Sequence, residues 1–414
     1  MITLAPYQND IVDFLNDTKD RGFIIAQMGL GKTMPCLEYL KDKDSCLVVA
    51  PEIVIRDAWD KDTIKIGYKG FNNVRKTKKF TGRDIVDYYF IKNCHGLEYD
   101  IVIFDEVTFC KHHTSDISKA CLKIKAAKKI GMTATPIHTN ILVAFGIIKL
   151  INPNALVKSK LTSAQKWKDF FYSHYTGGDP TQKITELYRG KPITKYARKD
   201  WQKYLAAFFY PAYINMDEPN QDFKIEYYNF KVALFKETKK KASEIRSSSY
   251  AAAQKKVALY QLGAEEKKNF LADILAKAKS KKIVIFINYL NSLDYLKHCF
   301  NFEYIIESSM AMEDRISVID RFNKADRGIM LASVKCCSHG VNLNTADLGI
   351  YFDLIDNYES YAQSVRRLFR KGKEKDLKIF SLYTVREELD RLKYYSSKKL
   401  EIFYEECRRF NGGG

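Results

Sequence analysis

Short apolar runs alternate with amphipathic segments in both halves of the chain. In the first half, the runs cover residues 23–25, 46–50 and 100–104, and a fourth at 129–133 ends in a hydroxyl side chain. In the second half, they cover residues 282–287, 328–332 and 348–352. Continuous apolar runs without a polar face are typical of parallel strands that helices cover on both sides. The pattern therefore predicts an α/β protein with two doubly wound parallel sheets.

The middle of the chain, residues 153–249, loses this alternation and becomes aromatic and basic. Rings and cations follow one another closely at Trp167, Phe170, Phe171, Tyr172, Tyr175, Lys191, Lys195, Arg198, Lys199 and Trp201. Two interpretations stay open here. The rings can stack on nucleic-acid bases while the cations contact phosphates, or they can form an aromatic core beneath a basic surface. Either way, we expect an aromatic and basic helical insertion that ends in a linker.

These patterns divide the chain into four predicted parts. Residues 1–152 form a first lobe, residues 153–249 the insertion and linker, and residues 250–385 a second lobe. Residues 386–414 form a C-terminal helix and tail. A chain of 414 residues is long enough for two or three separate cores.

The overall charge points to a polyanionic partner. The formal net charge is +18, for which nucleic acid is the commonest reason and solubility is the alternative. Nine cysteines without a CxxC pair predict reduced thiols in a cytosolic protein. No leader segment is visible, and no apolar run approaches the roughly 18 residues that cross a membrane. We therefore expect a soluble cytoplasmic protein without a membrane partner.

The first apolar run leads into a glycine-containing loop that is typical of phosphate binding. Its glycines can take backbone angles closed to other residues, so that N–H groups turn toward a phosphate chain at the start of a helix. Lys32 would reach the β and γ phosphates, and Thr33 would hold Mg²⁺. Ala26 stands where the pattern usually begins with glycine. A glycine-rich turn with a surface lysine is the alternative. The predicted nucleotide contacts are Met28, Gly29, Leu30, Gly31, Lys32 and Thr33.

Two adjacent acids, Asp105 and Glu106, follow the strand predicted at residues 100–104. Such a pair is costly at a buried strand end unless it faces a cation and water. Asp105 is therefore predicted to hold Mg²⁺ together with Thr33. Glu106 is predicted to polarise the water that attacks the γ-phosphate. A phosphate loop upstream makes the pair a stronger signal for a nucleotide site than either motif alone.

Other polar residues near these motifs are candidates for supporting roles. Gln8 lies upstream of the loop, where its carboxamide can donate to and accept from the edge of adenine. Thr133 and Thr135 follow the fourth apolar run, where they can couple the phosphate site to a bound ligand through hydrogen bonds. A simple Thr-Pro turn is the alternative. Between Lys61 and Lys92, a run of cations is either a solvated face or a phosphate-tracking surface.

The order of these motifs resembles that of the superfamily 2 helicases, and within them the Swi/Snf-type double-stranded DNA translocases. Gln8, the loop at residues 26–33, the acid pair, and residues 133–135 match the family's adenine, phosphate, magnesium and coupling motifs. Residues 132–140, with 150–153 after them, look like the third motif and its following helix. Val107 and Thr108 depart from the small residue and histidine that the family usually has after its acids.

The resemblance extends to the second half. Residues 333–347 look like the fifth motif, which implies nucleic-acid contacts by Lys335, Gly340 and Asn342. Residues 363–373 look like the sixth motif, which implies nucleotide contact by Gln363. Arg367 and Arg370 are three residues apart and share one face of a predicted helix. Arg370 is the candidate arginine finger, and Arg366 stands where the family usually has aspartate.

The resemblance implies two RecA-like lobes that hydrolyse ATP with Mg²⁺ and move along DNA without regard to sequence. The compact chain favours a bacterial or phage enzyme that remodels forks or branched DNA in replication, recombination or repair, with proteins of those processes as partners; a nuclear location stays open. Two alternatives remain at this point: an RNA helicase, and a nucleotide-gated clamp that binds DNA without productive turnover.

Overall fold

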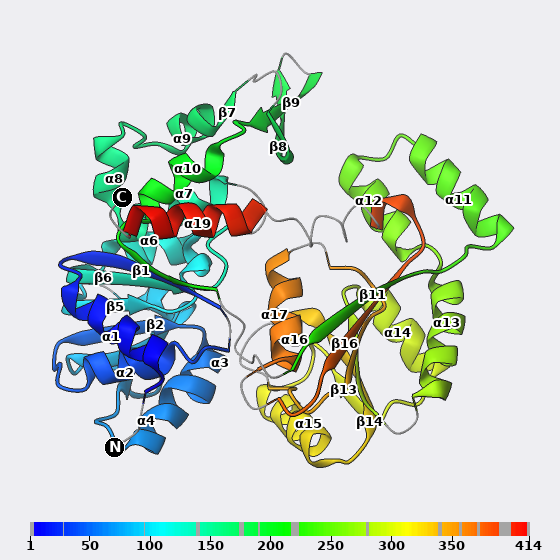
Figure 1. Ribbon diagram of the computed structural model, residues 1–414, viewed down its shortest axis with the longest axis horizontal. Helices are drawn as coiled ribbons and strands as arrows, with labels where there is room; N and C mark the ends of the chain where they lie inside the picture. The colour runs from blue at the N-terminus through cyan, green and yellow to red at the C-terminus, as the bar shows by residue number, and fades with distance from the viewer. Residues whose placement is uncertain are drawn as a thin grey trace. The chain divides into compact units, whose positions relative to one another are not determined.

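The computed structural model describes residues 4–27, 29–94, 96–137, 141–173, 178–188, 191–216, 223–278, 281–337, 342–355, 358–370, 373–388 and 399–411. The chain divides into two compact units (Figure 1). Lobe 1 comprises Met1–Glu218 and Lys398–Gly414, and lobe 2 comprises Pro219–Ser397. Each lobe is built on one large parallel sheet with helices packed against it, so the predicted pair of α/β lobes is confirmed.

Lobe 1 contains a seven-stranded sheet in the order β10-β1-β6-β5-β2-β4-β3, in which every neighbouring pair is parallel. The strands are β1 (Arg21–Ala26), β2 (Cys46–Ala50), β3 (Asn72–Asn73), β4 (Arg83–Asp87), β5 (Glu98–Phe104), β6 (Lys125–Thr133) and β10 (Ala212–Asn215). Every residue of β2 is buried, as expected for a central strand with helices on both faces. Because β1, β6 and β5 are neighbours, the side chains that follow these strands meet at one edge of the sheet.

Helices and helical turns connect these strands. They are α1 (Pro6–Asp17), α2 (Thr33–Leu40), α3 (Glu52–Val54), η1 (Ile55–Asp60), α4 (Lys61–Ile66), α5 (Val74–Thr77), η2 (Phe90–Asn93), η3 (Val107–Cys110), α6 (Asp116–Lys123) and α7 (Leu142–Ile151). Helix α1 buries Ile11 and Leu15, two members of its apolar face. The segment η1 is a π-helical turn between α3 and α4.

The segment after α7 also belongs to lobe 1, and it is not purely helical. It contains α8 (Pro153–Lys158), α9 (Ala164–Phe171), β7 (Tyr172–Ser173), β8 (Asp179–Tyr188), β9 (Lys191–Ala197), α10 (Trp201–Ala206) and η4 (Ala207–Phe209). Strands β7, β9 and β8 form a small antiparallel sheet. Trp167, Phe171 and Trp201 are fully buried in the lobe 1 core. Burial of these rings favours the aromatic-core interpretation over base stacking.

Lobe 2 contains a six-stranded parallel sheet in the order β11-β16-β15-β12-β14-β13. Its strands are β11 (Ile225–Lys231), β12 (Lys282–Ile287), β13 (Tyr304–Ile306), β14 (Gly328–Ser333), β15 (Leu348–Tyr351) and β16 (Leu377–Tyr383). Its helices are α11 (Lys236–Ser247), α12 (Ala252–Gln261), α13 (Ala264–Lys277), α14 (Leu290–Cys299), α15 (Met312–Lys324), α16 (Val334–Cys337) and α17 (Tyr358–Leu368). Within the described ranges, no helix is both long enough and apolar enough to cross a bilayer.

The boundaries predicted around the insertion and the C-terminus are wrong. Residues 153–249 do not form a separate part, because β10 completes the lobe 1 sheet and β11 forms an edge of the lobe 2 sheet. Residues 386–414 are also divided. Glu388 is buried in lobe 2, whereas helix α19 (Lys399–Asn411) belongs to lobe 1. There Phe403 is fully buried against Trp201 and Phe209. These assignments depend on tertiary packing, which sequence periodicity does not report.

Candidate nucleotide site

The loop between β1 and α2 has the backbone that a phosphate-binding loop needs. Gly29 and Gly31 have φ of 88° and 67°, in the left-handed region that glycine tolerates. The Nζ of Lys32 donates to the carbonyl oxygens of Ala26 at 2.9 Å and Gln27 at 3.3 Å. The ammonium therefore lies against the loop itself. Met28, another predicted contact, lies outside the described residues.

Gln8 lies next to this loop, as its predicted role requires. Its Nε2 donates to the carbonyl oxygens of Gly31 at 3.2 Å and Leu30 at 3.4 Å, while its Oε1 accepts from the backbone N–H of Ala5 at 3.0 Å. The carboxamide thus connects the start of α1 to the loop. The contact of Gln8 with adenine remains a prediction. In the structure, the Gln8 side chain also holds the loop against the start of α1.

The acid pair lies directly after β5, where its two members have different surroundings. The carboxylate of Asp105 accepts from the indole N–H of Trp59 at 3.0 Å and from the backbone N–H of Glu106 at 3.0 Å. Tyr88 donates its hydroxyl to the backbone carbonyl of Asp105 at 3.0 Å. Glu106 has a φ of 51°, which is uncommon for a residue with a side chain. Among the described residues, its buried Oε2 has no hydrogen-bond partner.

The electrostatics of this pair fit a cation. Burial, followed by the charge of Glu106, raises the pKa of Asp105 to about 6, while Trp59 and Lys32 lower it. The influence of Lys32 shows that the loop ammonium lies near the acid. Asp105 is buried, and the adjacent half-buried Glu106 has one buried oxygen without a partner among the described residues, so negative charge is concentrated here. Carboxylate oxygens, with the hydroxyl of Thr33 at the start of α2, are suitable ligands for Mg²⁺. The residues present therefore fit the predicted metal.

Thr133 and Thr135 lie at the end of β6, the strand between β1 and β5. Thr133 is fully buried, and its Oγ1 accepts from the backbone N–H of Thr135 at 3.1 Å. The Oγ1 of Thr135 is buried and has no partner among the described residues. The intervening carbonyl of Ala134 accepts from the hydroxyl of Tyr404, in α19, at 3.3 Å. The structure thus places the predicted coupling residues beside the loop and the acids.

Sequence reasoning missed three supporting side chains: Trp59, Tyr88 and Tyr404. Each makes a tertiary contact with a motif far away in the chain, and no local pattern indicates it. Trp59 lies in the π-helical turn η1, and Tyr404 lies in a helix that follows all of lobe 2 in sequence.

The candidates in lobe 2 lie on or near α17. Gln363 and Arg367 are largely buried, with 2% and 9% of their surface exposed. Arg370 follows the helix and donates its Nε to the carbonyl of Arg366 at 3.3 Å. The carbonyl of Arg367 accepts from the backbone N–H of Leu343 at 2.9 Å, which brings the fifth and sixth motifs together. Action of Arg367 and Arg370 on a nucleotide held by lobe 1 remains a prediction.

The predicted nucleic-acid contacts in lobe 2 are partly described. Lys335 in α16 and Asn342 are both exposed. The carbonyl of Asn342 accepts from Asn323 Nδ2 at 2.9 Å. Gly340 lies outside the described residues. Exposure is compatible with contact to a backbone phosphate, and this role remains a prediction.

Several cations of the run between Lys61 and Lys92 are engaged within lobe 1. Arg83 is 4% exposed and donates to the carbonyl oxygens of Leu40 at 2.6 Å and Lys43 at 2.7 Å. Arg75 pairs with Glu52 at 2.6 Å, and Lys69 pairs with Asp44 at 2.7 Å. These three cations therefore support lobe 1 locally, which weakens the phosphate-tracking interpretation of the run.

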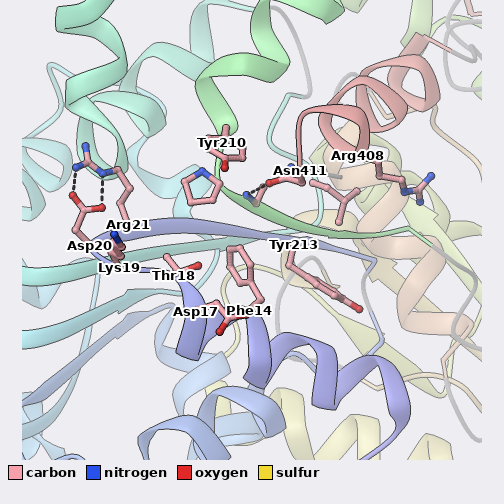
Figure 2. A pocket seen from close by; sticks show the side chains of 13 residues that line it. Phe14, Asp17, Thr18, Lys19, Asp20, Arg21, Tyr210, Tyr213, Arg408 and Asn411 are labelled. Carbon is pink, nitrogen blue, oxygen red and sulfur yellow. Dashed lines mark hydrogen bonds and ion pairs between the residues drawn. The ribbon is translucent and has the colours of Figure 1, made fainter. Parts of the chain in front are cut away.

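A cavity of about 660 Å³ lies elsewhere in lobe 1, at the amino end of β1 (Figure 2). Arg21 and Asp20 form an ion pair at its wall, and Asn411 accepts a hydrogen bond from the backbone N–H of Ala212 at 2.7 Å. The loop and the acid pair follow the carboxyl ends of their strands, so this cavity is distinct from the candidate site. Its lining mixes acids, cations and aromatic rings.

Comparison with protein families supports the motif order. Residues 7–301 match the family model described as SNF2-related domain, and residues 266–372 match the one described as Helicase conserved C-terminal domain. The first match alone covers well over half of the chain. Both matches include elements described above: the loop and acid pair in the first, and the whole of α17 in the second.

Individual relatives are distant in sequence. The chain is similar to the ISWI chromatin-remodeling complex ATPase ISW1 of Saccharomyces cerevisiae, with 23% identity covering 96% of this chain and 40% of the relative. It is also similar to an uncharacterized ATP-dependent helicase of Mycoplasma pneumoniae, with 22% identity covering 97% and 42%. A solved structure, the Sulfolobus solfataricus SWI2/SNF2 ATPase core in complex with dsDNA, aligns over 100% of this chain and 95% of that chain with 19% identity and a TM-score of 0.45. The chain thus spans about two fifths of the length of these two curated relatives.

Proposed function

Because this chain belongs to the SNF2-related family, within the Swi/Snf-like branch of superfamily 2, we propose that it is a DNA-dependent ATPase that moves along DNA. One observation carries the proposal. Lys32, the acid pair Asp105 and Glu106, and Thr133 lie at the carboxyl ends of three neighbouring strands. This arrangement suits a triphosphate with its metal, and the +18 charge of the chain suits a polyanion.

The proposed chemistry assigns a role to each side chain. On ATP binding, Lys32 would leave the loop carbonyls and contact the β and γ phosphates, and Thr33 and Asp105 would hold Mg²⁺. When bound, Mg²⁺ neutralises charge on the phosphate oxygens. Glu106 orients and polarises the attacking water through the oxygen that has no partner among the described residues. The arginine finger, Arg370, stabilises charge on the transferring phosphoryl group together with Arg367.

Coupling to DNA completes the proposal. Thr133 and Thr135 relay the nucleotide state to the surfaces that hold DNA, including Lys335, Gly340 and Asn342 in lobe 2. If each lobe holds the phosphate backbone in turn, the hydrolytic cycle becomes stepping. Contacts with phosphates carry no base information, so movement is independent of sequence. We place the activity in remodelling of forked or branched DNA during replication, recombination or repair.

The test is steady-state ATP hydrolysis against a panel of linear duplex, single-stranded, forked and four-way DNA, with duplex RNA included. We expect stimulation by duplex or branched DNA. Affinity for DNA should fall roughly a thousandfold between about 50 and 200 mM salt if about six phosphates are neutralised. Lys32→Ala is the control that abolishes hydrolysis. Stronger stimulation by RNA would favour an RNA helicase, and DNA binding without turnover would favour a nucleotide-gated clamp.

A further inference from the structure

We propose that Trp59 is a positioning residue that fixes the Asp105 carboxylate for Mg²⁺ bound with nucleotide. The indole Nε1 donates to Asp105 Oδ2 at 3.0 Å, and Asp105 Oδ1 accepts from the backbone N–H of Glu106 at 3.0 Å. Each carboxylate oxygen thus accepts from one of these two donors, and together the two donors define the plane of the carboxylate. This inference rests on the proposed function, and it concerns a residue that none of the motifs includes.

The indole itself has little freedom to move. Trp59 is 0% exposed and packs within an apolar cluster that includes buried residues of α2 and β2. Its ring meets Phe71 edge-on, with centroids 5.9 Å apart and planes at 86°. It is carried by the π-helical turn η1, and such turns inside helices are frequent at functional sites. A rigid donor supported in this way can hold a carboxylate in one rotamer.

Residues that hydrogen-bond to a metal ligand tune the metal without touching it. Loss of such a partner typically lowers metal affinity or activity about 10- to 100-fold. Trp59 is in that relation to Asp105. Without the indole N–H, the Asp105 carboxylate keeps the backbone N–H of Glu106 as its donor and can rotate away from the geometry that Mg²⁺ requires.

A purely structural role is the alternative, because any buried indole needs an acceptor. The chain offers a matched case for this alternative. Trp201, also 0% exposed, donates its Nε1 to the Oδ2 of Asp179 at 2.9 Å, and Asp179 is 4% exposed. Both pairs lie in lobe 1 and have the same chemistry. Only the first involves an acid at the candidate metal site.

The experiment compares Trp59→Phe, Trp201→Phe and wild type as full-length proteins. A fluorescent ADP analogue is titrated with Mg²⁺ present and again with EDTA. The dissociation constant in EDTA divided by the dissociation constant in Mg²⁺ measures the metal-dependent part of binding. In Trp59→Phe we expect this ratio to fall by about tenfold or more, with affinity in EDTA unchanged within about twofold. Trp201→Phe should keep the wild-type ratio. Equal ratios in the two variants would overturn the proposal.

A second measurement does not require Trp59→Phe to fold. The chain has three tryptophans, so 5-fluorotryptophan labelling gives three ¹⁹F resonances. Trp167→Phe and Trp201→Phe identify two of them. Addition of Mg²⁺ to the ADP-bound wild type should shift the Trp59 resonance most, and an unmoved Trp59 resonance would contradict the proposal. If the wild type shows no metal-dependent nucleotide binding, the proposed function itself is contradicted. Failure of the proposed function is therefore distinguishable from failure of the Trp59 proposal alone.

Discussion

Each lobe contains a buried aspartate just beyond the carboxyl end of a parallel strand. Asp105 follows β5 in lobe 1, and Asp353 follows β15 in lobe 2. They are 5% and 2% exposed, and burial raises the pKa of both carboxyl groups to about 6. In position, burial and pKa, the two residues are alike.

Their partners differ. Asp353 accepts from the backbone N–H groups of Asn288 and Tyr289, both at 3.1 Å, and from the hydroxyl of Ser292 at 2.9 Å. The charge of nearby Lys267 lowers the pKa of Asp353, and the Nζ of Lys267 pairs with the carboxylate of Glu388 at 2.7 Å. Both oxygens of Asp353 and both of Glu388 accept hydrogen bonds within lobe 2. This network supports the turn into α14.

Asp105 instead stands beside a second acid, one oxygen of which has no partner among the described residues. A raised pKa therefore does not separate a functional acid from a structural one, since ion networks also perturb pKa values. The buried oxygen of Glu106 without a hydrogen-bond partner among the described residues separates them. By this criterion the metal site that we propose lies in lobe 1, and we infer a structural role for Asp353.

The largest expected effect is at Glu106, the acid whose buried oxygen has no partner among the described residues. Glu106→Gln keeps the shape of the side chain and removes its charge, so that it can no longer polarise the attacking water. We expect DNA-stimulated ATP hydrolysis to fall about a hundredfold to ten-thousandfold, as for loss of a general base. Phosphate release at saturating ATP and DNA measures it. Glu98→Gln, at the exposed start of the same strand, is the matched control. A variant that keeps more than a tenth of the activity would contradict the assignment.

Asp353, whose oxygens both accept hydrogen bonds, should act on stability. Asp353→Ala leaves two backbone N–H groups and a hydroxyl without their acceptor, so lobe 2 should lose about 2 to 4 kcal/mol of unfolding free energy. Asp353→Asn should lose much less, because its amide oxygen can accept both N–H groups while its NH₂ donates to Ser292. Urea unfolding measures both variants. If Asp353→Ala instead weakened Mg²⁺-dependent nucleotide binding with unchanged stability, the comparison between the two acids would fail.

The parts of this site that the sequence predicts are those with a local signal. Apolar runs marked the parallel strands, Gly29 and Gly31 marked the loop, and the acids marked the end of β5. Each of these depends on neighbours in sequence, and the resemblance to Swi/Snf-type translocases assembled them in order. The two-residue strand β3 and the β8-β9 hairpin carried no comparable pattern.

The rest depends on contacts across the fold. Trp59 meets Asp105 over a separation of 46 residues, and Tyr404 meets Ala134 over 270. Likewise, β10 is short and β11 mixes polar and apolar residues, so the sequence does not show which sheet each strand joins. In the structure, β10 is an edge strand of the lobe 1 sheet and β11 an edge strand of the lobe 2 sheet. The rings at Trp167 and Trp201 could not be assigned to core or surface from composition. Only packing distinguishes those outcomes.

A smaller effect should appear in the pH dependence of stability. The pKa of Asp353 is raised from 3.8 in the unfolded chain to about 6 in the fold. Its contribution to stability is therefore fully present below about pH 4 and is lost as pH rises through 6. Relative to Asp353→Asn, wild type should lose about 2 kcal/mol between pH 4 and pH 7. Unfolding free energies at several pH values measure the difference, and a constant difference would indicate an ordinary pKa.

The smallest expected effect tests whether α19, which follows lobe 2 in sequence, contributes to coupling in lobe 1. Tyr404 donates to the carbonyl of Ala134, between the two predicted coupling threonines. Tyr404→Phe removes one neutral hydrogen bond, worth about 1 kcal/mol, and keeps the ring in place.

We therefore expect DNA stimulation of hydrolysis by Tyr404→Phe to fall about two- to fivefold, with basal hydrolysis and the KM for ATP unchanged. Tyr260→Phe is the matched control, because the Tyr260 hydroxyl donates to the carbonyl of Glu387 at 3.1 Å within lobe 2. Hydrolysis with and without duplex DNA is measured for both variants. An equal loss in both would mean that the hydroxyl contributes only to stability. A loss of DNA stimulation confined to Tyr404→Phe would show that α19 supports the predicted coupling residues Thr133 and Thr135.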